Sequence, residues 1–164
     1  MNKPMILAAL AAVAVLAAVG WTVVSHGESP REAAALALQP NDAELVAKGG
    51  ALYAAKCAAC HGARLEGQPD WRTRGADGLL PAPPHDASGH TWHHPDETLF
   101  RITKFGVAKI IDDPNYKTAM PIYQDRMSDE EIVAVLSWIK AQWPASIRQR
   151  HDQMNAQAAK PPRP

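Results

Sequence analysis

The run Cys57-Ala58-Ala59-Cys60-His61 decides how the rest of the chain is interpreted. Two thiols three positions apart can add to the two vinyl groups of one haem, and the adjacent histidine then lies where its imidazole reaches the iron. The alternatives are chance in an alanine-rich segment, a C-x-x-C redox pair, and half of a zinc site. A redox pair does not require the histidine, and a zinc site needs a second pair of ligands, yet the chain has only two cysteines. The motif therefore predicts one covalent haem c at Cys57, Cys60 and His61.

Length and charge limit the classes of protein that need to be considered. With 164 residues, 46% of them hydrophobic, the chain is long enough for one domain with a real core. Lysine plus arginine and aspartate plus glutamate each number 17, so the formal charge is zero. The sequence has no basic stripe of the kind that binds nucleic acid, so we expect no nucleic-acid partner.

The N-terminus carries an apolar run of 20 residues, from position 5 to position 24. As a helix it would be about 30 Å long, the thickness of the hydrocarbon core of a bilayer. The competing interpretation is a cleaved signal peptide, which usually has a shorter apolar region and a small-x-small cleavage site. We expect an uncleaved transmembrane signal anchor at residues 1–24, with Lys3 on the cytoplasmic side and Trp21 near the outer interface. The chain would then be single-pass in the cytoplasmic membrane, with its remainder on the periplasmic side.

Helix signals follow a linker at residues 25–41, which mixes glycine and proline with an alanine-leucine patch. Asn41 or Asp42 reads as the N-cap of a helix that runs towards Cys57. Gly49 and Gly50 would each weaken an isolated helix by about 1 kcal/mol, which predicts that another helix approaches closely there.

The partner helix is indicated near the other end of the chain. Ser128 and Glu131 make a capping box, and Met127 with Ile132 makes a hydrophobic staple, so a helix should begin at Ser128 and end before Pro144. A third helix is predicted at residues 95–106 from its acidic start, its apolar spacing and its closing glycine. No stretch alternates as a strand does, so the expected fold class is all-α.

These motifs together resemble the class I c-type cytochromes. The likeness covers residues 42–144 and rests on four motifs: Gly49-x-x-x-Tyr53, Cys57-x-x-Cys60-His61-Gly62, Met120-Pro121 and Leu136-Ser137-Trp138-Ile139-Lys140. It implies a cytochrome c domain in which the first and last helices cross at Gly49 over one haem, with His61 and Met120 as axial ligands. It also implies one-electron transfer with redox partner proteins and no enzyme activity of its own. The proline- and histidine-rich stretch at residues 62–96 departs from the family pattern.

The choice of the second ligand also has a chemical basis. A thioether is a soft, neutral ligand that favours Fe(II), raises the reduction potential and closes the iron to substrates. Met127 already serves as the staple residue, and Met154 lies in a polar tail beyond Pro144. Met120 lies in a loop before a proline, where its side chain can be aimed at the iron. The competing interpretation is a loop methionine that packs into the core.

The histidine-rich loop has two interpretations. His85, His90, His93 and His94 could bind a second metal such as copper or zinc, because imidazole suits both. Hydrogen bonds to propionates, backbone or solvent are the favoured interpretation. Residues 79–81 are expected to form a wall of the haem pocket, and a nearby backbone carbonyl, not identifiable from sequence, should accept the His61 N–H. The candidate propionate partners are Trp71, Arg72, Arg74 and Tyr116.

The last stretch, residues 145–164, is polar and rich in proline, and it predicts a short helix that gives way to a disordered tail. Electron transfer by a membrane-tethered haem domain is the function that the whole sequence favours. Two alternatives stay open at this point: a haem subunit of a larger oxidase or dehydrogenase complex, and a haem enzyme or sensor in which Met120 is displaceable.

Overall fold

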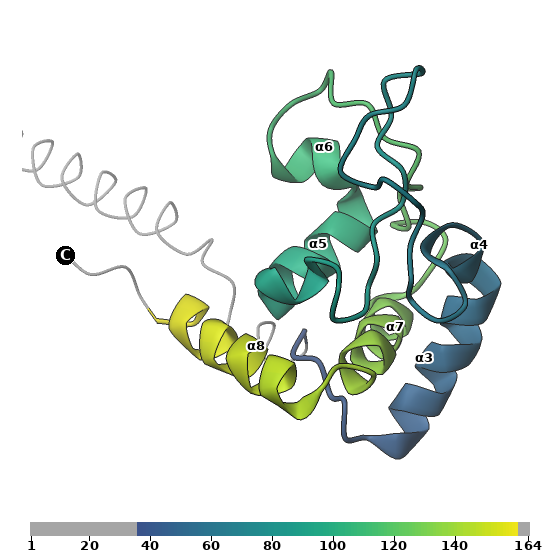
Figure 1. The fold of residues 1–164 in the computed structure, drawn as a ribbon. Helices are drawn as coiled ribbons and strands as arrows, with labels where there is room; N and C mark the ends of the chain where they lie inside the picture. The colour runs from purple at the N-terminus through teal and green to yellow at the C-terminus, as the bar shows by residue number, and fades with distance from the viewer. Residues whose placement is uncertain (1–35, 161–164) are drawn as a thin grey trace, which may run out of the picture. The chain divides into compact units, whose positions relative to one another are not determined.

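The computed structural model describes residues 36–160, and every regular element in this part of the chain is a helix (Figure 1). The predicted all-α fold class is therefore confirmed for these residues. The predicted anchor and most of the predicted linker lie outside the described residues. Between residues 36 and 160, no helix is both long and apolar enough to cross a membrane.

Helix α3 (Ala43–Lys56) leads directly into the cysteine motif. Its N-cap is Asp42, whose carboxylate accepts the N–H of Leu45 at 3.0 Å, so the structure selects Asp42 over Asn41. Glu44 lies in the first turn and Lys56 in the last, as the helix dipole favours. The four-residue helix α4 (Ala58–His61) follows at once and carries the second half of the motif.

Helix α7 (Asp129–Ala141) begins with the predicted capping box. The Ser128 hydroxyl accepts the N–H of Glu131 at 3.2 Å, and the Glu131 carboxylate accepts the N–H of Ser128 at 2.9 Å. Met127 and Ile132, the two staple residues, are both buried in the hydrophobic core. The helix ends before Pro144, as predicted.

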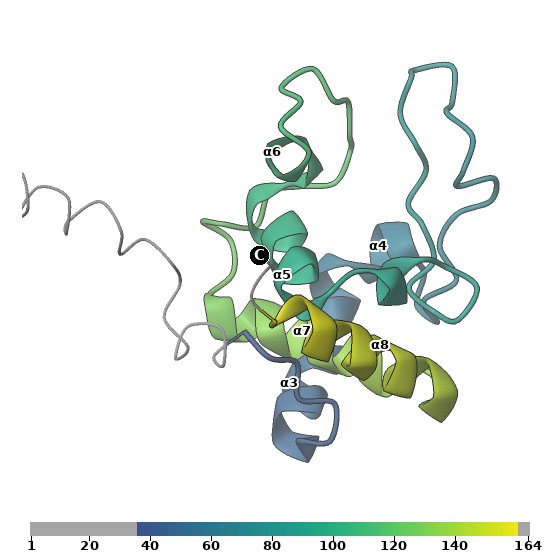
Figure 2. The same ribbon diagram turned by 90° about the vertical axis from the view of Figure 1, so that its left-hand side faces the viewer.

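The crossing of α3 and α7 is the main packing contact of the fold (Figures 1 and 2). A Cβ atom on Gly49 would overlap the backbone carbonyl of Ala134 in α7. The missing side chain therefore allows the two backbones to approach. Beside this point the rings of Tyr53 and Trp138 lie 4.6 Å apart between centroids.

Helix α5 (Asp96–Phe105) packs against α7 and confirms the third predicted helix. It buries Leu99 and Phe100, and it ends at Gly106, whose φ of +84° suits a glycine. The short helix α6 (Val107–Ile110) follows and packs back on α5.

Helix α8 (Ala145–Ala158) corrects the prediction for the end of the chain. Instead of a short helix that gives way to a disordered tail, the structure has the 14 helical residues labelled α8 in Figure 2. They pack against the 3₁₀ helix η1 (Thr91–His93). The reason is a polar contact set that composition does not reveal. His151 is fully buried, and its Nε2 donates to the backbone carbonyl of His94 at 2.9 Å.

Asp96 at the start of α5 joins four parts of the domain. Its carboxylate accepts the N–H of Leu38 and the side-chain amide of Asn155, both at 2.9 Å, and its own N–H donates to the Asn155 side chain. Lys140 of α7 is buried beside it, with Nζ 3.8 Å from Asp96 and 2.7 Å from Asp152 of α8. Segment 36–40, α5 and α8 thus share one cluster of hydrogen bonds, which α7 joins through the Lys140 ion pairs.

Replacement of Gly49 by alanine tests the crossing. In a free helix this change would add about 1 kcal/mol of stability, but here the new methyl group meets the Ala134 backbone, so we expect a loss of about 1–3 kcal/mol. Gly50→Ala is the comparison, because its methyl would meet the movable indole of Trp138, 2.8 Å away, and should cost less. Urea unfolding measures both. A Gly49→Ala protein as stable as the unaltered chain would contradict this packing.

The buried His151 predicts a loss of stability in mild acid. Burial, and then the neighbouring Lys140, hold the pKa of His151 below its usual value, while Asp96 and Asp152 oppose this. The unfolded chain therefore binds more protons than the folded one near pH 6, so stability is complete above about pH 6.5 and falls below it. We expect His151→Gln to weaken this pH dependence between pH 7.5 and 5.5 in urea unfolding. Equal pH dependence in His151→Gln and the unaltered chain would be the contrary result, and His93→Gln, at an exposed position, is the control.

Candidate functional site

The two cysteines lie on one tight turn. Cys57 is both the C-cap of α3 and the N-cap of α4, and Cys60 lies within α4, so the helix junction sets their spacing. Cys57 is half-buried and packs against the core, whereas Cys60 is exposed. The turn therefore presents two thiols from one compact piece of backbone.

The chemistry of Cys57 does not suit a redox pair. Burial raises the pKa of its thiol to about 11, although the nearby Lys56 opposes the shift. A redox-active C-x-x-C pair depends on a thiol whose pKa is lowered, so that a thiolate is present at neutral pH. The thiol of Cys57 is instead protonated at neutral pH.

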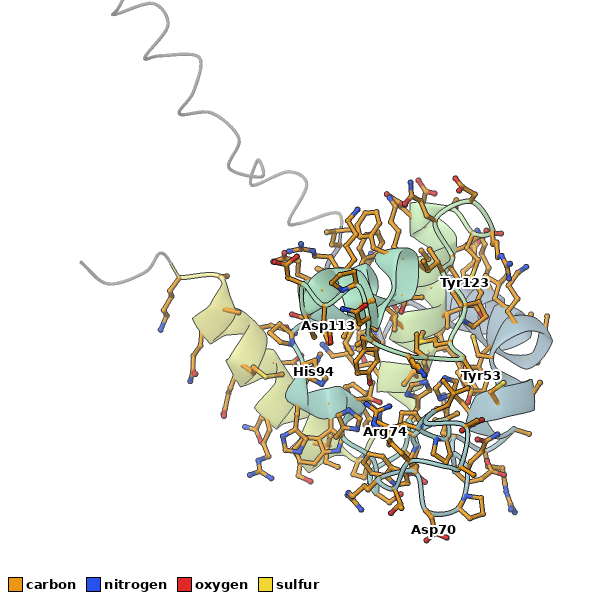
Figure 3. All side chains as sticks on the ribbon, turned by 90° about the horizontal axis from the view of Figure 1, so that it is seen from above. Tyr53, Asp70, Arg74, His94, Asp113 and Tyr123 are labelled. Atoms are coloured by element: carbon orange, nitrogen blue, oxygen red, sulfur yellow. The ribbon has the colours of Figure 1, made fainter. Side chains whose placement is uncertain are left out.

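Tyr53 and Tyr123, both labelled in Figure 3, bond the backbone at the two ends of the motif. Tyr123 donates to the backbone carbonyl of Lys56, just before the motif, and Tyr53 donates to that of Gly62, just after it, both at 2.8 Å. Burial raises the pKa of both phenols, which keeps them as donors. The resemblance had singled out Tyr53 for helix packing, but nothing in the sequence pointed to Tyr123.

His61 is fixed in one tautomer. Its Nδ1 lies 2.9 Å from the carbonyl oxygen of Pro83, and because a carbonyl can only accept, Nδ1 carries the proton. The residue is 8% exposed. Burial lowers the pKa of His61, and the smaller effect of the hydrogen bond to Pro83 is to raise it. His61 is therefore a neutral imidazole whose Nε2 keeps a lone pair for a metal. Pro83 is the backbone acceptor that the sequence could not identify.

The segment that carries Pro83 is pressed against the turn after the motif. Gly67, at φ +67°, and Gly89 both lie so close to Pro84 that a Cβ on either would overlap its backbone. Gly67 also donates its N–H to the carbonyl of His61 at 2.8 Å. Glycines on both sides of Pro84 thus allow the loop to reach the histidine.

Met120 is half-buried and packs against the same hydrophobic core as Cys57. Its N–H donates to the Thr118 hydroxyl at 3.1 Å, which fixes the backbone before Pro121. Met127 is buried as the staple residue, and Met154 lies half-buried in α8. Ligation by Met120 stays a prediction.

The four loop histidines pair with aromatic rings. His85 stacks on His61 with 4.0 Å between ring centroids, His93 on Trp92 at 3.8 Å, and His90 on Trp71 at 5.1 Å. His94 meets His90 edge-on at 5.5 Å. Within residues 36–160, no three or more His, Cys, Asp or Glu side chains gather to hold a metal ion. The described part of the chain gives the second-metal interpretation no support.

The predicted propionate partners are engaged with one another or with backbone. The Arg72 guanidinium lies 4.0 Å from the centre of the Trp71 ring. Arg74 donates to the carbonyl of Gly78 at 2.7 Å and lies over Tyr116 at 5.4 Å. These contacts neither require nor prevent a propionate.

The residues of the site fit a covalently attached haem. Cys57 and Cys60 present two thiols from one turn, and the adjacent His61 keeps a free Nε2. Trp92, whose buried indole Nε1 lacks a hydrogen-bond partner among the described residues, stacks on His93 in η1.

A comparison with protein-family models agrees with this fit. The model described as cytochrome c matches residues 46–143, more than half of the chain. The chain belongs to the cytochrome c family. Membership implies a covalently bound c-type haem. No curated protein and no solved structure matches the chain.

The match runs from the first turn of α3 to Trp143, and α8 therefore lies outside the matched region. The matched part includes the cysteine motif, the histidine-rich loop and Met120. Helix α8, which packs on η1, begins just after the matched residues.

The two tyrosines that hold the motif give a paired test. Tyr53→Phe and Tyr123→Phe should each lower the free energy of unfolding of this cytochrome by about 1 kcal/mol, because each removes a hydrogen bond to a backbone carbonyl. Tyr116→Phe is the control, because within the described residues its hydroxyl makes no hydrogen bond. Denaturant unfolding measures the free energy of unfolding of the three variants. A cost for Tyr116→Phe equal to the other two would argue against a specific role of these bonds.

Proposed function

We propose that this cytochrome transfers single electrons, with haem c attached through Cys57 and Cys60 and both axial positions closed by His61 and Met120. Family membership supports haem-based electron transfer, and electron carriage better than enzyme activity. The observation that carries the finer proposal is the bond from His61 Nδ1 to the Pro83 carbonyl, because it leaves Nε2 free to bind iron.

The two proposed ligands are both neutral. Burial keeps the imidazole of His61 uncharged, and the Met120 thioether carries no charge in any state. A bound haem supplies the one-electron couple, and a His/Met pair raises its reduction potential relative to two imidazoles. With both axial positions filled, no position remains for a substrate.

The protein's own contribution is to hold these side chains in fixed positions. The α3–α7 crossing fixes the cysteine turn at the end of α3, and Tyr53 and Tyr123 hold its two ends. A rigid surrounding keeps reorganisation small when the electron arrives or leaves, as an electron carrier requires. No residue of the chain is assigned a catalytic role.

The proposal includes the cellular location. The apolar residues 5–24, preceded by Lys3, support a single-pass anchor in the cytoplasmic membrane with the haem domain on the periplasmic side. A tethered carrier would exchange electrons with partner proteins at that surface, either alone or as the haem subunit of a larger complex.

Covalent attachment is the first expected result. On a denaturing gel the unaltered protein should keep its haem, and a variant with Cys57→Ala and Cys60→Ala should lose it, because no thioether remains. Haem-dependent peroxidase staining is the measurement, and Cys60→Ala alone, which keeps one thiol, is the matched comparison. Haem extracted intact from the unaltered protein by acid acetone would contradict the proposed attachment.

Closure of the iron is the second expected result. Ferrous protein should not bind carbon monoxide at neutral pH, whereas Met120→Ala should bind it and have a lower reduction potential, since the thioether is gone. Met127→Leu keeps a core side chain of similar volume and should behave as the unaltered protein does. Ready carbon monoxide binding by the unaltered protein would favour the sensor or enzyme alternative.

The anchor has a separate test. We expect the protein in the membrane fraction of the expressing cells, with residues 1–24 still present by mass spectrometry of the intact chain. A mature N-terminus near Ser25, with the protein in the soluble periplasmic fraction, would show a cleaved signal peptide instead.

A further inference from the structure

The contact between His85 and His61 is not explained by the proposed function alone. The two imidazole rings are stacked, with 4.0 Å between their centroids and 21° between their planes. We propose that His85 is a positioning residue, which fixes the plane of the His61 imidazole on the haem iron. The inference rests on the proposed ligation by His61.

The hydrogen bond to Pro83 does not by itself fix the His61 ring. One bond at Nδ1 sets the direction of the ring edge but still allows the ring to tilt about that bond. A flat ring lying on one face removes this freedom. His85 supplies that face from the same short segment as Pro83, so bond and stack move together.

His85 can restrain its neighbour because it is itself held at three points. Its N–H donates to the carbonyl of Leu65 at 2.8 Å, and its carbonyl accepts from the Trp143 indole at 2.7 Å. Its ring Nδ1 lies 2.7 Å from the Thr91 hydroxyl. Thr91 and Trp143 are both buried, which strengthens these bonds relative to bonds exposed to water.

The edge of the Tyr53 ring lies 6.4 Å from the His85 ring between centroids and adds an aromatic contact to this cluster.

The orientation of an axial imidazole has a spectroscopic consequence. The plane of the ring decides how its π orbitals meet the iron d orbitals, and contacts beyond the ligands set that plane. The principal g values of a low-spin ferric haem therefore report on it directly. They respond to ring orientation even when the protein's stability does not change.

The test uses the haem-loaded protein and four variants. His85→Leu removes the flat ring and should shift the ferric g values, broaden their signals and change the reduction potential. His85→Phe restores a flat ring and should return the g values towards those of the unaltered protein. Thr91→Val keeps the shape but loses the partner of the His85 ring, and it should cause a smaller shift of the g values. His93→Leu is the control, because His93 stacks on Trp92.

Each outcome has a defined meaning. If haem-loaded His85→Leu keeps the g values and the potential of the unaltered protein, then His85 merely packs and the inference is overturned. Should the leucine variant not fold, the same result for Thr91→Val overturns it. If His93→Leu shifts the g values as much as His85→Leu does, the effect is not specific and the inference also fails. A high-spin ferric spectrum of the unaltered protein would instead overturn the proposed ligation, so the two failures can be told apart.

Discussion

The hydrogen bond from His61 to the Pro83 carbonyl, 2.9 Å long, is the contact on which the proposed site depends. It joins the end of the cysteine motif to a point 22 residues later and determines which ring nitrogen is free. The bond requires the loop between them to fold back on the motif. Gly67 and Gly89 allow that approach, because neither brings a side chain against Pro84.

The loop is held in turn by the C-terminal part of the chain. The Trp143 indole donates to the carbonyl of His85, and His151 of α8 donates to that of His94. Asp96 ties the start of α5 to α8 through Asn155. Helix α8 therefore helps to position a histidine-rich segment that lies far from it in sequence. The Trp143 bond, just before α8, holds the loop directly at His85, two residues after the Pro83 carbonyl that accepts from His61.

The sequence predicts the local features and misses the distant ones. The start of α3 at Asn41 or Asp42 and the capping box at Ser128 could be predicted because a cap involves residues only three positions apart, although the structure was needed to select Asp42. The close approach of a second helix at Gly49 could also be predicted, because a glycine inside a helix lowers its stability unless it allows close packing. The contacts of Pro83 and Tyr123 could not be predicted, because each joins residues that only the folded chain brings together. Docking of α8 was missed because its partners are polar and lie on other helices.

We propose that His61 and Met120 together close the two axial positions of the haem. The ferric absorption spectrum tests it most directly, since iron bonded to a thioether has a weak charge-transfer band in the near infrared. We predict that the band is present in the unaltered protein and in Met127→Leu, and absent in Met120→Ala. A band that persists in Met120→Ala would contradict the assignment of the ligand. Its absence from the unaltered protein would contradict the closed His/Met site altogether.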